Sequence, residues 1–274
     1  MNEAMNEKNL ANQRYWDAAA ADWEQLRDQD QMWRRCAQRP ELAFDGESLA
    51  MIQLYTGNLH GKRACVLGSG DNYAAFALVG MGAQVTSTDI SEQQLAVAQK
   101  RAAKLELEIT FRRADATSLN DMADMKGEFD LVCSSNGFYV WIAEPKRIFQ
   151  QVYRLLKPGG FYIFYDVHSF QRPWKDQVAP LEMEQPYTAT GPFKEEEYGQ
   201  ANYQFHWRIS DLLNPLIDAG LVLRQMAESS PKDARFWTGI SYLPGSDESL
   251  LDWRNNPRAG LPVWLTVAAQ KPPG

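Results

Sequence analysis

From Lys62 onward the chain alternates short apolar runs with helix-like stretches, and this order constrains the fold more than any other feature. The strand-like runs are residues 63–67, 84–88, 107–112, 129–134 and 161–167. Helical periodicity lies between them, at 72–81, at 91–104 and in the stretch that begins at Pro145. Such alternation is typical of βαβ units, in which right-handed crossovers join parallel strands. The sequence therefore predicts an α/β fold with a doubly wound, mostly parallel sheet.

The regions on either side of this alternation do not follow its pattern. Residues 9–27 and 47–56 have the periodicity of helices, so residues 1–60 are predicted to form an N-terminal helical cap. A segment rich in proline and aromatic residues indicates a lid, inserted at about 168–205 in a domain that spans residues 61–274. Further strands are expected at 202–207, 221–226 and 261–269, and a further helix at 209–219.

Composition narrows the class of function. The chain has 28 Lys and Arg against 35 Asp and Glu, a net charge of −7, and no basic run longer than two residues, which disfavours a nucleic-acid partner. The three cysteines are widely spaced, which is typical of core residues in a reducing compartment. The polar first residues do not resemble a signal peptide, and no apolar run approaches the roughly 18 residues of a membrane span. We therefore expect a soluble, cytoplasmic protein without a membrane partner, and the sequence indicates no oligomeric state.

The turn after the first strand, VLGSG, indicates a bound ligand. Gly68 and Gly70 permit positive φ angles and a close approach between ligand and backbone. Asp89 ends the second strand, where a carboxylate can accept hydrogen bonds from the hydroxyls of a ribose. A dinucleotide fingerprint requires glycine at the place of Tyr73, and the Gly-Lys-Ser/Thr sequence of a phosphate-binding loop does not occur. The remaining nucleoside cofactor is S-adenosyl-L-methionine.

At these residues the chain resembles a known family. Residues 63–166 are similar to the core of the class I S-adenosylmethionine-dependent methyltransferases, most closely to bacterial enzymes that act on small molecules. Five segments in family order carry the resemblance: VLGSG (66–70), TDIS (88–91), RADAT (113–117), FDLVCSSNGFYVW (129–141) and RLLKPGG (154–160). The resemblance implies a seven-stranded, Rossmann-like sheet, S-adenosyl-L-methionine as cofactor, and a small-molecule substrate.

The resemblance also implies which residues bind the cofactor. The expected contacts are Ser134 and Asn136 beside the amino group and sulfonium, Gly68, Ser69 and Gly70 along the methionine moiety, Asp89 at the ribose, Ile90 on the adenine, and Asp115 with Ala116 at the adenine edge. For the two aspartates the alternative is a structural role, as a helix N-cap or in a turn.

Two positions depart from the family pattern. Val66 stands two residues before Gly68, where the family often has an acidic residue, and Asn72 stands where a GxGxG loop has its third glycine. Asn72 is of a type that tolerates left-handed backbone better than most. Both positions lie at the methionine end of the expected site, so they leave open which bond to sulfur is broken.

Catalytic candidates come from strand ends beside the expected cofactor. His168 follows strand 161–167 directly, and an ordinary pKa of about 6.5 suits a general base. Tyr139 follows strand 129–134 and is expected to contact the transferred methyl group or the acceptor. The alternatives are a structural hydrogen bond for His168 and core packing for Tyr139.

Aromatic residues of helix 9–27 are a further group of candidates. In the family this helix often folds over the cofactor, and Tyr15, Trp16 and Trp23 lie on it. An aromatic face near a sulfonium gains on the order of 1 kcal/mol from cation–π attraction. Packing alone is the alternative reason for these side chains.

The functional prediction is S-adenosylmethionine-dependent methyl transfer to a small-molecule acceptor. No metal site is predicted, because the three histidines lie far apart and without clustered cysteines or carboxylates. Residues 134–137 occupy the place of the Asn-Pro-Pro-aromatic tetrad that marks amino-group methylation in the family, which disfavours that activity. Two alternatives stay open: cyclisation or cleavage of the cofactor itself with release of methylthioadenosine, and a non-catalytic cofactor-binding protein.

Overall fold

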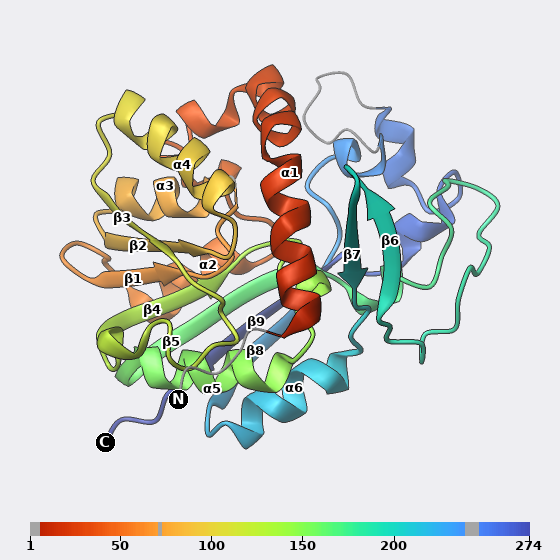
Figure 1. Cartoon of the computed structure of the whole chain (residues 1–274). Helices are drawn as coiled ribbons and strands as arrows, with labels where there is room; N and C mark the ends of the chain where they lie inside the picture. Colours follow the sequence, from red (N-terminus) through yellow and green to blue (C-terminus); the bar gives the residue numbers. More distant parts are fainter. Residues whose placement is uncertain (1–5, 71–72, 239–246) are drawn as a thin grey trace.

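Seven strands form the central sheet, in the spatial order β3-β2-β1-β4-β5-β9-β8 (Figure 1). The computed structural model describes residues 6–70, 73–238 and 247–274. The strands of this sheet are β1 (Arg63–Val66), β2 (Gln84–Asp89), β3 (Ile109–Arg113), β4 (Phe129–Ser134), β5 (Leu156–Val167), β8 (Val222–Ser229) and β9 (Trp264–Gln270). The strands β1 to β5 pair in parallel, whereas β9 is antiparallel to both of its neighbours. The predicted doubly wound, mostly parallel seven-stranded sheet is confirmed.

Helices cover both faces of the sheet, which explains why β1, β4 and β9 are apolar along most of their length. One face packs against α2 (Ser48–Thr56), α3 (Tyr73–Gly80) and α4 (Glu92–Lys104). The other face packs against α5 (Pro145–Leu155) and α6 (Ile209–Asp218). The start of α4 is the predicted one, because the Ser91 hydroxyl accepts a hydrogen bond from the backbone N–H of Gln94 at 3.1 Å.

The strand order reverses between β1 and β4. The chain runs outward from β1 through β2 and β3, then returns to the other side of β1 as β4. In open α/β sheets ligands bind in the crevice at the carboxyl ends of the strands, at such a reversal. The topology therefore places a binding site over the ends of β1, β2 and β4.

Two further segments lie beside these carboxyl ends. The long helix α1 (Glu7–Asp30) packs against α4 and against a hairpin of β6 (Phe193–Glu197) and β7 (Gln200–Gln204) (Figure 1). In the described part of the chain the hairpin forms a separate two-stranded sheet. The strand expected at 202–207 thus starts earlier and pairs outside the main sheet. The division into a cap at 1–60 and a domain at 61–274 stays a prediction.

Other element boundaries differ little from those predicted. The expected helix 209–219 is α6, which continues through Pro215 without ending there. The apolar run 161–167 is the second half of β5, because residues 156–160 extend this strand at its start. None of the described helices is long and apolar enough to cross a membrane.

Candidate functional site

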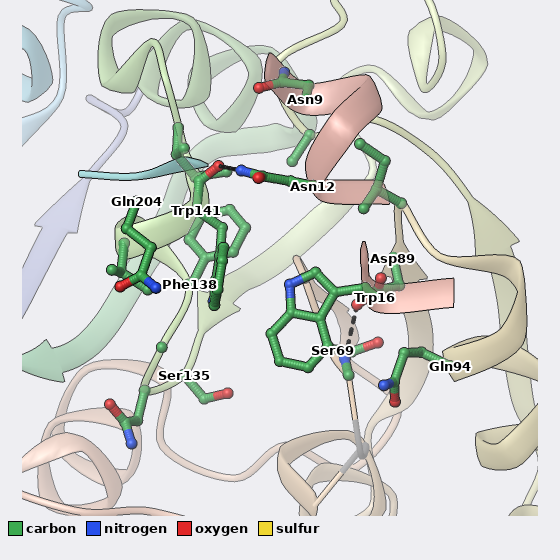
Figure 2. Close-up of a pocket in the computed structure, with 18 of the residues that line it drawn as sticks. Asn9, Asn12, Trp16, Ser69, Asp89, Gln94, Ser135, Phe138, Trp141 and Gln204 are labelled. Carbon is green, nitrogen blue, oxygen red and sulfur yellow. Dashed lines mark hydrogen bonds between the residues drawn. The ribbon is translucent and has the colours of Figure 1, made fainter. Parts of the chain in front are cut away.

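A cavity of about 400 Å³ lies at the carboxyl ends of β1 to β5, beside α1 (Figure 2). This volume falls within the range of small-molecule sites. Its walls come from the loop after β1, the ends of β2 and β3, the segments after β4 and β5, and one face of α1. Trp16 projects into the middle of the cavity, between Ser69 and Asp89 on one side and Phe138 and Trp141 on the other (Figure 2).

The loop after β1 requires its two glycines for different reasons. Gly68 has a φ of +57°, and a Cβ atom on it would lie 2.3 Å from a ring carbon of Phe138. Gly70 has a φ of +48°, but a Cβ atom there would meet nothing within 4 Å. The hydroxyl of Ser69 between them is 2.7 Å from that of Ser87, which ties the loop to β2. The loop therefore presents backbone to the cavity, as a ligand that approaches closely would need.

Val66 and Asn72 are the two positions that depart from the family pattern, and the structure describes only the first of them. Val66 is fully buried in the core, so it contributes no charge to the loop. Asn72 lies outside the described residues, as does its neighbour Asp71. The charged side chain that does line the cavity near this end is Arg27 of α1, whose guanidinium lies 5.2 Å from the ring centre of Tyr73.

Asp89 holds the glycine loop and faces the cavity. Its carboxylate accepts hydrogen bonds from the backbone N–H of Gly70 at 2.8 Å and of Ser91 at 2.9 Å. The side chain is only 7% exposed, and this burial raises the pKa of Asp89 to about 6 despite the hydrogen bonds that lower it. Each carboxylate oxygen has a further acceptor position, so Asp89 can also accept from a ligand.

Asp115, at the end of β3, is fixed by neighbours on two elements. One oxygen accepts from the backbone N–H and the hydroxyl of Thr117, at 2.8 and 2.7 Å. The other accepts from the side-chain amide of Asn9 on α1 at 3.0 Å. Ile90 and Ala116 line the same end of the cavity. The carboxylates expected at the ribose and at the adenine edge thus lie in one cavity, over adjacent strands.

Aromatic side chains of α1 and of the segment after β4 form one wall. Trp16 packs edge-on against Trp141, with ring centres 5.1 Å apart, and also contacts Trp23 at 5.7 Å. All three line the cavity, whereas Tyr15 does not. Tyr15 stacks on Trp141 from outside the cavity, and its hydroxyl donates to Glu197 of β6 at 2.9 Å. Tyr15 therefore supports the wall instead of contacting a ligand.

Two predicted residues near β4 point into the core. The Ser134 hydroxyl lies 2.8 Å from that of Tyr162, and the Tyr139 hydroxyl lies 2.7 Å from the same oxygen. Neither residue lines the cavity, while Ser135 and Asn136 do. The structure thus gives Tyr139 the packing role that was its alternative, and burial raises the pKa of its hydroxyl well above the ordinary value.

His168 is also placed outside the cavity. Its ring is fully buried, with Nε2 2.7 Å from a carboxylate oxygen of Glu228 on β8. Nδ1 accepts from the backbone N–H of Phe170 at 3.1 Å, which caps the short helix η5 (Ser169–Gln171). Burial lowers the pKa of His168, and Glu228 opposes that effect. The expected general base is therefore a structural histidine that anchors the segment after β5.

Several cavity residues were missed by the sequence reasoning. Asn9, Asn12 and Arg27 share the face of α1 that carries Trp16 and Trp23, so helical periodicity was a signal that could have found them. Gln94, Phe138, Arg172 and Gln204 line the cavity from elements far apart in the chain, and no local pattern marks them. Among the described residues no cluster of His, Cys, Asp or Glu could hold a metal ion.

Comparisons with known proteins agree with this geometry. Residues 65–164 match the family described as methyltransferase domain. A Geobacillus protein named as a methyltransferase is 34% identical over 116 residues, which are 41% of this chain and 45% of that protein. A ubiquinone biosynthesis O-methyltransferase of Idiomarina loihiensis is 29% identical over 46% of this chain and 51% of its own length. The chain thus spans about half the length of these curated relatives.

A solved structure extends the likeness to most of the chain. The S-adenosylmethionine-dependent methyltransferase of Mesorhizobium loti superposes with a TM-score of 0.58 and 24% identity, over 82% of this chain and 98% of that one. At this identity the likeness establishes the fold. Residues 65–164 match the methyltransferase domain family, and the predicted fold, which is that of the class I S-adenosylmethionine-dependent methyltransferases, is confirmed.

Proposed function

We propose, from the methyltransferase domain at residues 65–164, that the protein transfers the methyl group of S-adenosyl-L-methionine to a small-molecule acceptor. The observation that carries the proposal is the cavity itself. A glycine loop, two carboxylates at adjacent strand ends and an aromatic wall from α1 meet in one space of small-molecule size. The relatives named as methyltransferases support the same reaction.

The cavity residues suit different parts of the cofactor. Asp89 is proposed to accept hydrogen bonds from the ribose hydroxyls, and Asp115 from the adenine amino group. Ser69 and the backbone of Gly68 and Gly70 are proposed to contact the methionine moiety, with Arg27 as a positive charge near this end. When bound, the cofactor supplies a methyl group on a positively charged sulfur.

The protein's own part in the reaction is proposed to be alignment. Displacement at a methyl group is an in-line reaction, and holding donor and acceptor together supplies roughly 7–11 kcal/mol. The ionisable side chains that line the described cavity are Arg27, Asp89, Asp115 and Arg172. None of these is placed or suited as a dedicated base at the acceptor end. The preferred acceptor is therefore one whose attacking atom is already deprotonated or carries an available lone pair.

The products of the reaction test the proposal. Purified protein is incubated with S-adenosyl-L-methionine, with and without a small-molecule cell extract, and the nucleosides are identified by mass spectrometry. S-adenosylhomocysteine that forms only with extract supports methyl transfer. Methylthioadenosine without extract would show a reaction on the cofactor itself, and no nucleoside product at all would leave only cofactor binding. The Asp89→Ala variant should lose cofactor binding, and unchanged affinity would contradict the site.

The same proposal includes the chemical class of the acceptor and the cellular location of the protein. The net charge of −7 supports a small molecule over a nucleic acid as acceptor. A cytoplasmic location is proposed because Cys36, Cys65 and Cys133 are buried and form no disulfide within the described residues. Cell fractionation that recovers the protein outside the cytoplasmic fraction would overturn this part.

A further inference from the structure

Arg172 is a cationic side chain at the end of the cavity opposite the two carboxylates. It follows η5 after β5, whereas Asp89 ends β2 and Asp115 follows β3, on the other side of β1. The contacts proposed above for the ribose, the adenine and the glycine loop use the ends of β1, β2 and β3. The space over β4 and β5 is therefore left for the acceptor, and Arg172 lines that space.

The guanidinium of Arg172 has donor capacity that the protein does not use. Its contact with a charged group is a long ion pair, 3.8 Å from Asp166 Oδ1, and in the described part of the chain its five N–H groups make no hydrogen bond. Its side chain is 24% exposed, and it lines the cavity. A partly buried cation with unused donors is costly unless a ligand pairs with it.

The carboxylate of Asp166 is shared between this arginine and the backbone. The Asp166 carboxylate already accepts hydrogen bonds from the backbone N–H groups of Gly137, Tyr139 and Val167, at 3.0, 2.9 and 2.7 Å. Through these hydrogen bonds Asp166 mainly stabilises the loop after β4. Burial also raises the pKa of Asp166, while Arg172 and these N–H groups lower it.

The backbone that carries Arg172 is firmly held. The His168 ring caps η5, and the Ser169 hydroxyl donates to the Trp207 carbonyl at 2.7 Å. The amide of Gln171 donates to two carbonyls of the segment before β9, at 3.2 and 3.1 Å. The arginine is thus presented by a rigid turn, as a substrate-orienting group requires.

The walls around this end are mostly apolar. Val140, Ile142 and Val167 line it beside the aromatic rings of Phe138 and Trp141, and the uncharged polar side chains there are Ser135, Asn136 and Gln204. Among the described lining residues Arg172 is the one cation on this side, and it has a carboxylate for a neighbour. One arginine suits a singly charged group bound bidentately, and the nearby Asp166 disfavours a doubly charged phosphate.

We propose that the acceptor is an apolar or aromatic small molecule with a carboxylate, and that Arg172 binds this carboxylate and orients the acceptor toward the transferred methyl group. This inference rests on the proposed function, since it specifies the acceptor of the same site. Arg172 is a specificity-determining residue in this view, and takes no part in breaking the bond to sulfur.

The test uses a matched pair of small probes. The protein, saturated with S-adenosylhomocysteine, is titrated calorimetrically with benzoate and with benzamide, which have the same ring but differ in charge. The wild type should bind benzoate at least tenfold more tightly than benzamide. Arg172→Gln should lose this preference, and Arg172→Lys should keep part of it because the charge remains. Arg254→Gln, in an exposed residue outside the cavity, should behave as the wild type.

Two results would overturn the inference: a wild-type preference for benzoate of less than twofold, or a preference that survives in Arg172→Gln. Phenyl phosphate serves as a third probe, and tighter binding than benzoate would overturn the choice of a carboxylate. The affinity for S-adenosylhomocysteine should be the same in Arg172→Gln and the wild type, which verifies that the variant folds. If the wild type does not bind S-adenosylhomocysteine, the proposed function fails, while the benzoate preference measured without it still decides the role of Arg172.

Discussion

Asp89 shows how one carboxylate can serve both the fold and a ligand. It ties the N–H of Gly70 to the end of β2, and it remains at the cavity surface. Because its pKa is about 6, the free protein carries this side chain in both protonation states near that pH. A ribose donates its hydroxyls to the charged form, so binding must favour loss of the proton.

The affinity for S-adenosylhomocysteine should therefore depend on pH. We expect a constant dissociation constant above about pH 7 and a progressive loss of affinity below pH 6, approaching tenfold per pH unit. Asp89→Asn should bind weakly with a flatter profile, and Asp124→Asn, in an exposed residue, should follow the wild type. Titration calorimetry from pH 5 to 8 measures the dissociation constant of each variant at each pH. A wild-type affinity that stays constant down to pH 5 would contradict the role of Asp89.

Substitutions in the glycine loop can separate two costs in the free energy of unfolding: that of a left-handed backbone with a side chain, and that of steric overlap with Phe138. Gly70→Ala should lower the free energy of unfolding by about 1–2 kcal/mol, the cost of a left-handed residue. Gly68→Ala should cost roughly 1–3 kcal/mol more, because the new methyl group overlaps the Phe138 ring. Urea unfolding measures both values. Gly127→Ala, with a φ of +70° and open space away from the cavity, is the control, and equal losses in all three variants would refute the overlap.

Sequence reasoning predicted some site residues and missed others for a physical reason. A strand end fixes the edge of the sheet at which a residue lies, which was enough for Gly68, Asp89 and Asp115. It does not fix the direction of a side chain, which changes from one residue to the next. The hydroxyl of Ser134 therefore points into the core, while its neighbour Ser135 lines the cavity.

At the scale of elements, α1 completes the cavity through a few polar contacts. Asn12 is buried on α1 and makes three hydrogen bonds. Its amide donates to the carbonyls of Trp141 and Tyr203 at 3.0 and 2.9 Å, and its carbonyl accepts from the Tyr203 N–H at 2.7 Å. The side chain of Asn12 thus joins α1 to the segment after β4 and to the hairpin. Figure 2 shows its hydrogen bond to Trp141.

Loss of this junction should open the helix. Asn12→Ala should lower the free energy of unfolding by about 2–3 kcal/mol, because it leaves buried backbone groups of Tyr203 and Trp141 without their partner. Hydrogen exchange of residues 7–30 should become faster, and S-adenosylhomocysteine should dissociate sooner. Gln25→Ala, at an exposed position of the same helix, should change neither. Unchanged exchange in α1 of Asn12→Ala would show that the aromatic contacts alone hold it.

Elements with an apolar pattern could be predicted, and the hairpin could not. The inner strands β1, β4, β5 and β9 are covered on both faces, so each contains an apolar run that the sequence displays. By contrast β6 is Phe-Lys-Glu-Glu-Glu and almost entirely exposed. Its pairing with β7 rests on backbone hydrogen bonds, which leave no mark on side-chain hydropathy. This is why the segment was interpreted only as a lid.

At the scale of the whole molecule, a ligand that joins β1, β2, β3 and α1 should stabilise all of them together. S-adenosylhomocysteine at one hundred times its dissociation constant adds about 2.7 kcal/mol to the free energy of unfolding. For a chain of this size that corresponds to a rise of roughly 5–10 °C in the unfolding temperature. Scanning calorimetry measures the shift. Asp89→Ala at the same concentration should show none, and an equal shift in that variant would place the ligand elsewhere.

The bond between Asn12 and Tyr203 joins residues 191 positions apart in the chain. During synthesis at about 5–20 residues per second, α1 emerges roughly 10–40 s before the hairpin that receives it. Throughout that interval Trp16 and Trp23 lack the β7 strand, and in its earlier part they also lack Trp141. A ribosome-bound chain that ends between Asp115 and the hairpin therefore has the glycine loop and both carboxylates but no closed cavity, and the cavity is completed only at a late stage of synthesis.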